Sequence, residues 1–546
     1  MKPFHLRPPR RTTVAVAGAV FSLVLTLTPF AHAAPLPAMG DGAELTTSAE
    51  KRMGERIARE LYRDPDYCDD PILNDYVQEL WQPLLAAARA SGEIGPDLDQ
   101  RFAWQVLLGR DRTINAFALP GGYFGVHLGL IAATGSRDEL ASVLGHELSH
   151  VTQRHIARLM GKQAQQAPWL LGAMILGALT IGRNADAGNA LLVGGQAVAA
   201  QNQLNFSRDM EREADRIGLQ VMTQAGYDGR GFLSMFDKLQ QAMRLNDSGA
   251  YPFLRSHPLT TERIADMQSR LGLQTRTTTD GTDLRHAMMQ ARARVLSSPG
   301  AEALRTLLLR EVDASALIAQ PTARQVSTWT ASLLASVQLR DFESATRARS
   351  ALEPLVRNDA AARTLLRLFD AETSLAGGDA TRALILLQGA DTPRGPTLHT
   401  PQDLSIGPRA GMLLAGQAMV RGAGTSESHR ALTQSLQGWV SSHPADAQAW
   451  QILAGLYTTQ TQPLRALRAE AEVQVARLDY TAALDRLRSA QDLTRSASAS
   501  ADHIEASIID ARRHQIEQLL RDQGPDKPGA GGSDGSKRDF GLSVTH

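Results

Sequence analysis

The stretch HELSH at 146–150 places two imidazoles on either side of a carboxylate. On a helix, residues four positions apart lie on the same face, one turn from each other. His146 and His150 can therefore bind one metal ion through neutral imidazole nitrogens, and Glu147 can act as a base toward water at that ion. A catalytic zinc site needs three protein ligands and one open position. The pattern thus predicts a hydrolytic metal centre whose third ligand lies elsewhere in the chain.

The third ligand is expected on a second helix, in the stretch MEREAD at 210–215. Glu211 and Asp215 are four residues apart and share a face, and the small Ala214 leaves room for close helix packing. We expect Glu211 to complete the metal site and Asp215 to accept a hydrogen bond from a ligand imidazole, which would fix its tautomer. Glu213 is expected to be a solvated carboxylate.

Two other histidines are predicted to take no part in the site. His155 is five residues beyond His150, so it should point to another face, and His127 lies in a strand pattern without a partner. The only cysteine, Cys68, excludes a disulfide framework.

The elements that must carry these residues can be read from local patterns. Ser136 with Glu139 three residues later forms a capping-box signal, which starts a helix at about Arg137 and places HELSH on it. Apolar spacing and turn residues predict the neighbouring elements: helices over 49–92, 207–226 and 229–244, a strand over 101–108, and a strand, Pro-Gly-Gly turn and strand over 113–131.

The N-terminus reads as a cleaved secretory signal peptide, residues 1–33, with basic residues, an apolar run and a small-residue cleavage site. An uncleaved membrane anchor is the alternative. Residues 167–182 are strongly apolar but shorter than the about 20 residues of a bilayer span. They are expected to form a buried or hairpin segment beside the site, with peripheral membrane contact as the alternative. Lys+Arg and Asp+Glu both number 57, which argues against nucleic-acid binding.

The second half of the chain is predicted to be entirely helical. Trp450, Leu453, Ala454, Tyr457 and Ala466 follow the spacing of a tetratricopeptide repeat, in which stacked helix pairs bury their apolar faces. A helical bundle without repeats is the alternative. The expected division is a protease domain at 34–274, a linker at 275–283, a helical repeat domain at 284–522 and a disordered tail at 523–546.

The two motifs, GHELSH and FSRDMEREADRIG, together with NAFALPGGYFGVHLGLI, resemble the HtpX-type zinc metallopeptidase family. The resemblance covers about residues 50–520 and implies a mainly helical chain. A gluzincin-type α+β metalloprotease domain with a small edge-stranded sheet would precede an all-α solenoid of tetratricopeptide type. It also implies one Zn²⁺ held by His146, His150 and Glu211, with Glu147 as general base.

The family resemblance suggests roles for three further residues. Asn115 would belong to an edge strand onto which an extended substrate adds as a further strand. His257, in RSHPLTTERI, would be a fourth, switchable ligand that closes the site, although a loop histidine bonded to local backbone is the alternative. Arg263 would stabilise the oxyanion or hold the segment of His257.

The secreted, repeat-bearing branch of the family implies a periplasmic zinc endopeptidase with a chaperone-like role. Its partners would be unfolded or misassembled outer-membrane β-barrel proteins, and the repeat domain would contact the β-barrel assembly machinery. The alternative is a chaperone or assembly scaffold whose protease site is held closed. A hydrolase of small molecules is disfavoured by the edge strand and the large second domain.

Overall fold

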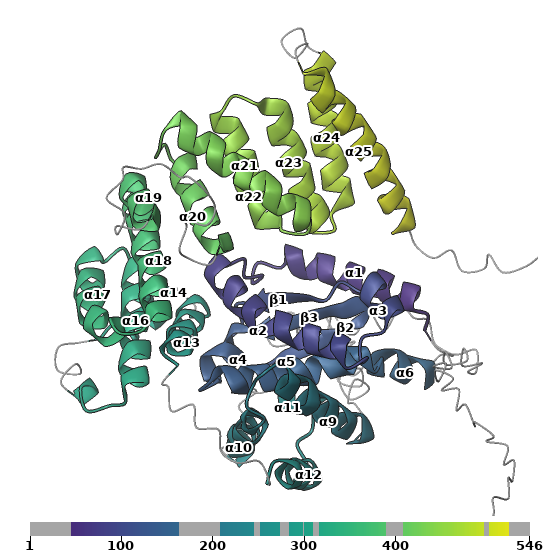
Figure 1. Cartoon of the computed structure of the whole chain (residues 1–546), viewed down its shortest axis with the longest axis vertical. Helices are drawn as coiled ribbons and strands as arrows, with labels where there is room; N and C mark the ends of the chain where they lie inside the picture. The colour runs from purple at the N-terminus through teal and green to yellow at the C-terminus, as the bar shows by residue number, and fades with distance from the viewer. Residues whose placement is uncertain are drawn as a thin grey trace, which may run out of the picture. The chain divides into compact units, whose positions relative to one another are not determined.

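The computed structural model confirms a mainly helical chain with one small sheet (Figure 1). The residues that the structure describes are 45–162, 208–244, 252–272, 283–298, 300–309, 316–388, 408–495 and 502–523. The predicted signal peptide, the apolar segment 167–182, most of the linker 275–283 and the tail beyond Gln523 lie outside these residues. Among the described residues, no helix is both long and apolar enough to cross a membrane.

The first part of the chain surrounds a three-stranded sheet. Its elements in chain order are α1 (Thr47–Arg63), α2 (Pro71–Ala90), α3 (Pro96–Arg101), β1 (Gln105–Gly109), β2 (Ala116–Leu119), the 3-10 turn η1 (Pro120–Gly122), β3 (Tyr123–His127), α4 (Leu128–Ala133), α5 (Arg137–Thr152), α6 (His155–Lys162), α9 (Arg208–Gln224), α10 (Arg230–Arg244), α11 (Phe253–Ser256) and α12 (Thr261–Leu271).

The structure refines three of the local predictions. The helical segment 49–92 is divided into two helices, because Pro71 begins a new helix with Asp70 as its cap. The strand predicted at 101–108 begins only at Gln105, since the preceding residues end α3. The second strand of 113–131 ends at His127, where the chain continues as α4.

The sheet leaves β2 at its edge. The strand order is β1-β3-β2, with β1 parallel and β2 antiparallel to β3. Asn115, directly before β2, is buried, and its carbonyl accepts a hydrogen bond from the backbone of His127. The described part of the sheet therefore has β2 as an edge strand, with its outer backbone groups facing away from β3.

Helix α5 is the central element of this part. Ser136 caps it by accepting a hydrogen bond from the backbone of Glu139 at 3.2 Å. A capping box would also have the Glu139 side chain accept a hydrogen bond from the backbone N–H of Ser136. Instead, the Glu139 carboxylate accepts from the backbone N–H of Gly135 and from the ammonium group of Lys238. Every residue from Glu139 to Thr152 is buried. The polar side chains of the HELSH motif therefore need partners inside the protein.

Two glycines set the distance between α5 and α9. Gly145 and Gly218 face each other, and a Cβ atom added at Gly218 would lie 3.0 Å from the backbone of Gly145 and His146. This contact is closer than side chains normally allow, so glycine at both positions favours the close approach of the two helices. The approach brings the carboxylates of α9 within reach of the imidazoles of α5.

The remainder of the described chain is helical. Its helices are α13 (Leu284–Leu296), α14 (Gly300–Arg305), α16 (Thr322–Gln338), α17 (Phe342–Val356), α18 (Ala360–Gly377), α19 (Ala380–Gln388), α20 (Pro408–Val420), α21 (Ser426–Ser442), α22 (Ala447–Thr459), α23 (Pro463–Ala476), α24 (Tyr480–Arg495) and α25 (His503–Asp522). The residues that predict a tetratricopeptide repeat are buried in α22 and α23. The repeat assignment itself stays a prediction.

Helix α13 is tied to the first part of the chain. The imidazole of His286 lies 2.6 Å from the Tyr76 hydroxyl through Nδ1 and 2.9 Å from the Thr134 carbonyl through Nε2. The Arg292 guanidinium is buried and pairs with Asp70 of the α2 cap and Glu372 of α18, both at 2.6 Å. Polar contacts as well as apolar packing therefore join the helices after residue 283 to those before it.

The glycine contact gives a first prediction. Gly218→Val should lower the free energy of unfolding by about 1–3 kcal/mol, because the new side chain forces α9 away from the backbone of α5. Gly438→Val, inside α21, is the matched control, since a Cβ at Gly438 meets nothing within 4 Å. The measurement is thermal and denaturant unfolding of both variants. Equal stability of the two variants would contradict the proposed role of the contact.

Candidate metal centre

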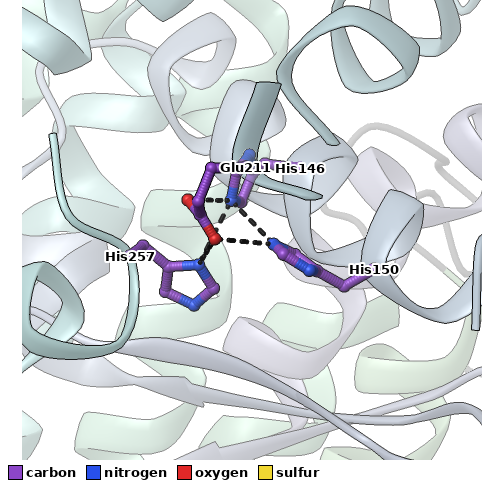
Figure 2. Close-up of side chains that lie close together, drawn as sticks. All are labelled: His146, His150, Glu211 and His257. Carbon is purple, nitrogen blue, oxygen red and sulfur yellow. Dashed lines mark hydrogen bonds and ion pairs between the residues drawn. The ribbon is translucent and has the colours of Figure 1, made fainter. Parts of the chain in front are cut away.

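Four buried side chains from three separate segments converge on one point (Figure 2). His146 and His150 come from α5, Glu211 from α9, and His257 directly follows α11. One ligand atom from each residue can be chosen so that all four lie within 4.8 Å of one another. The structure thus brings the three sequence-predicted ligands together and adds the predicted fourth.

Four of the six distances between these atoms are 3.0–3.5 Å, short enough for one shared ion. The Nε2 atoms of His146 and His150 are 3.0 Å apart, and the Nδ1 atom of His257 lies 3.3 Å from Nε2 of His146. Glu211 Oε1 lies 3.1 Å from His257 Nδ1 and 3.5 Å from His150 Nε2. A tetrahedron with metal–ligand bonds of about 2.0–2.1 Å has edges of roughly 3.3–3.4 Å. The donor set, three imidazoles and one carboxylate, also suits a divalent metal.

Glu147 is placed as a base beside the cluster. Its carboxylate is buried, neither oxygen has a hydrogen-bond partner among the described residues, and Oε1 lies 3.5 Å from Nε2 of His257. A buried carboxylate without a donor is costly unless the site supplies one. Water or substrate at the metal centre would be such a donor.

Asp215 and Arg263 hold the ligands from behind. Asp215 Oδ1 lies 3.0 Å from Nδ1 of His146, on the side of the ring away from the cluster. The Arg263 guanidinium donates to both oxygens of Asp215 at 2.7 Å and lies 2.7 Å from Glu211 Oε2. It also donates to the Pro258 carbonyl at 2.9 Å. Of the two predicted roles, this geometry favours holding the segment of His257, because all three guanidinium nitrogens already have partners.

In the metal-free site, burial and neighbouring charges shift the pKa values of the clustered side chains in opposite directions. Burial lowers the pKa of His146, but Asp215 and Glu211 outweigh burial and raise this pKa to about 9. Burial, aided by the charge of His146, holds the pKa of His150 well below its ordinary value. Burial raises the pKa of Glu211, but His257 and His146 outweigh it and hold the value well below normal. In the absence of metal, a proton on His146 therefore offsets part of the buried negative charge.

His155 does not point away from the site, contrary to the sequence-based expectation. Its Nδ1 lies 2.9 Å from Nδ1 of His150, and its Nε2 lies 2.9 Å from Glu213 Oε2. Glu213 is consequently not a freely solvated carboxylate, since it also pairs with Arg158 at 3.0 Å. The prediction assumed one continuous helix. Instead α5 ends at Thr152, Arg154 adopts a positive φ of 51°, and α6 starts at His155.

His127 lies apart from the cluster, at the end of β3. Its Nδ1 is 2.8 Å from the Thr113 hydroxyl and 3.9 Å from Asp111 Oδ1, so it has local contacts and, as expected, is not one of the clustered side chains. Burial lowers its pKa, with Asp111 acting in the opposite direction.

Comparison with known proteins agrees with this geometry. Residues 71–271, which carry the whole cluster, match the model of peptidase family M48. This part of the chain is an M48 metallopeptidase domain. The M48 domain holds all four candidate ligands, and its family implies a divalent metal.

One curated relative extends the likeness beyond the M48 domain, and two others match shorter parts of the chain. The chain is 29% identical to the "Beta-barrel assembly-enhancing protease" of Yersinia pestis, over 89% of this chain and 92% of the relative. It is 37% identical to the "Putative beta-barrel assembly-enhancing protease" of Vibrio cholerae, over 43% of this chain and about half, 47%, of the relative. The "Mitochondrial metalloendopeptidase OMA1" of Arabidopsis thaliana is 32% identical over 36% of each chain.

The raised pKa of His146 predicts how the metal-free protein responds to pH. A histidine with a folded pKa of about 9, above its ordinary 6.5, contributes stability that is full below about pH 6.5 and is lost as pH rises through about 9. We expect the free energy of unfolding in chelator to fall by a few kcal/mol from pH 6.5 to 9.5. His146→Gln should show a clearly smaller fall. Denaturant titrations at both pH values measure this, and parallel declines would exclude His146 as the cause.

Proposed function

We propose that this protein is a periplasmic zinc endopeptidase that acts on stalled or misassembled outer-membrane β-barrel proteins, with its active site closed at rest by His257. The observation that carries the proposal is the buried cluster of His146, His150, Glu211 and His257 beside Glu147, whose carboxylate accepts no hydrogen bond from the described residues. The names of the Yersinia and Vibrio relatives support the class of substrate.

The choice of zinc rests on the donor set. Three imidazole nitrogens and one carboxylate suit zinc better than calcium or magnesium, which prefer six or more oxygen ligands. When bound, zinc would polarise the scissile carbonyl and lower the pKa of water. Glu147 would accept the proton of that water and deliver it to the leaving amine. Asp215 would hold the ring of His146, and Arg263 would hold both Asp215 and Glu211.

The position of His257 supports closure of the site at rest. Its side chain is 1% exposed and takes the fourth corner of the cluster, which a catalytic site must leave open. The described cavity that borders both His146 and His257 has a volume of about 10 Å³, room for about one water molecule. A peptide would enter only after His257 leaves. An extended chain could then lie along the edge strand β2 near α5.

The repeat-like helices and the relatives' names also support the chaperone-like role and contact with the β-barrel assembly machinery. Residues 1–33 support export to the periplasm through their sequence alone. An assembly scaffold with a permanently closed protease site is the second candidate, favoured by the buried state of the cluster. The two candidates differ in whether Glu147 is needed.

The role of Glu147 is tested by Glu147→Gln. This variant should bind zinc and fold like the wild type but cleave an unfolded protein about 10²–10⁴-fold more slowly, because the base is lost. Glu262→Gln, an exposed change on α12, is the matched control and should cleave normally. Cleavage, metal content and rescue of outer-membrane assembly are measured together. Full cleavage by Glu147→Gln would exclude the mechanism, and full rescue of assembly without cleavage would favour the scaffold.

Closure is tested by His257→Ala. With three zinc ligands left, the variant should cleave an unfolded protein about tenfold faster or more, because a minor open state commonly holds about 0.1–10% of molecules. The double variant Glu147→Gln/His257→Ala should lose this gain. A rate equal to or below that of the wild type, at equal zinc content, would mean that His257 does not close the site.

A further inference from the structure

We propose that His155 is the positioning residue for the zinc ligand His150, acting through a relay that ends on Glu213. The inference rests on the proposed metal site but not on the identity of the substrate. It begins with the contact between Nδ1 of His150 and Nδ1 of His155, which are 2.9 Å apart inside the protein. The spacing of the HELSH and MEREAD motifs does not predict a role in the metal site for His155 or Glu213.

The proton positions follow step by step from the geometry. His150 turns Nε2 toward the other ligands, so this atom must carry its lone pair when metal is bound. Its proton is then on Nδ1, which donates to Nδ1 of His155. His155 must accept there, so its own proton is on Nε2, which donates to Glu213 Oε2 at 2.9 Å. One consistent set of tautomers satisfies all three residues.

The two metal-binding histidines of α5 are thus held in different ways. Asp215 meets Nδ1 of His146 directly at 3.0 Å, whereas a neutral imidazole stands between His150 and the nearest carboxylate of the relay. In this set of tautomers the ring of His155 carries a single proton, on Nε2, and is neutral. The arrangement orients His150 without a further buried negative charge next to the site.

The end of the relay lies at the surface. The Glu213 side chain is 38% exposed and pairs with Arg158 of α6 at 3.0 Å, while His155 is fully buried. A carboxylate in that position loses little of its hydration and still fixes the ring of His155. The relay joins the end of α5, the start of α6 and the second turn of α9, so it also fixes where α6 leaves α5.

The experiment measures zinc affinity by chelator competition in the purified full chain. Removing the partner of a metal-bound imidazole typically weakens metal binding 10–100-fold. His155→Leu, which has no acceptor, should raise the zinc dissociation constant by about that factor. His155→Asn, whose amide oxygen replaces the accepting nitrogen, should stay within about threefold of the wild type. The d–d absorption of the cobalt-substituted protein should change in His155→Leu and be restored in His155→Asn.

The matched control is His286→Leu. His286 is buried like His155 and also bonded through both ring nitrogens, but to Tyr76 and Thr134, away from the cluster. It should lower thermal stability without changing zinc affinity. Wild-type affinity in His155→Leu, equal weakening in His286→Leu, or no rescue by asparagine would each overturn the inference. Absence of zinc binding by the wild type would instead overturn the proposed metal site. Zinc binding by a wild type without proteolytic activity would overturn only the proposed function.

Discussion

The site depends on the burial of more negative than positive charge around α5. Glu147, Glu211 and Asp215 are all buried, and Arg263 is the buried cation that faces them in the described structure. Three carboxylates against one guanidinium leave an excess of two negative charges, which a divalent cation would balance. In the metal-free protein burial lowers the pKa of His146, but Asp215 and Glu211 outweigh burial and raise it to about 9. The folded protein therefore has uncompensated buried negative charge, which favours metal binding. A proton on His146 neutralises only part of that charge.

Burying these carboxylates together requires close packing of α5 and α9 and a cation that contacts more than one of them. The facing glycines let α9 approach α5 closely enough for Glu211 to meet the imidazoles. Arg263, from α12, then contacts both carboxylates of α9 and the carbonyl of Pro258. One side chain thus holds the ligand helix and the segment of His257 together. These contacts explain why the Arg263 side chain is buried, although arginine side chains are usually exposed.

The sequence predicted the chemistry of the site better than its surroundings. HELSH and the Glu211–Asp215 pair are spaced by the helix itself, so one turn of α5 and one of α9 already determine which side chains share a face. His155 could not be predicted in this way, because its place depends on the break at Arg154, where no glycine or proline marks the end of α5. Glu213 likewise looks solvated until α6 packs beside α9. The mainly helical class was evident from composition and spacing, whereas the exact ends of β1 and β3 depend on tertiary contacts.

The anchoring of Pro258 also limits how the proposed closure can be released. Since Arg263 holds the Pro258 carbonyl and both carboxylates of α9, moving α12 would disturb Glu211 and weaken metal binding. Movement of His257 alone breaks none of the Arg263 contacts, because it follows a separate helix of only four residues; it must give up the stack on Phe253, whose ring centroid is 4.6 Å away. A change in the backbone between Phe253 and His257 would withdraw the imidazole and leave three ligands, Glu147 and Arg263 in place. The geometry therefore favours opening at α11, with the rest of the metal centre unchanged.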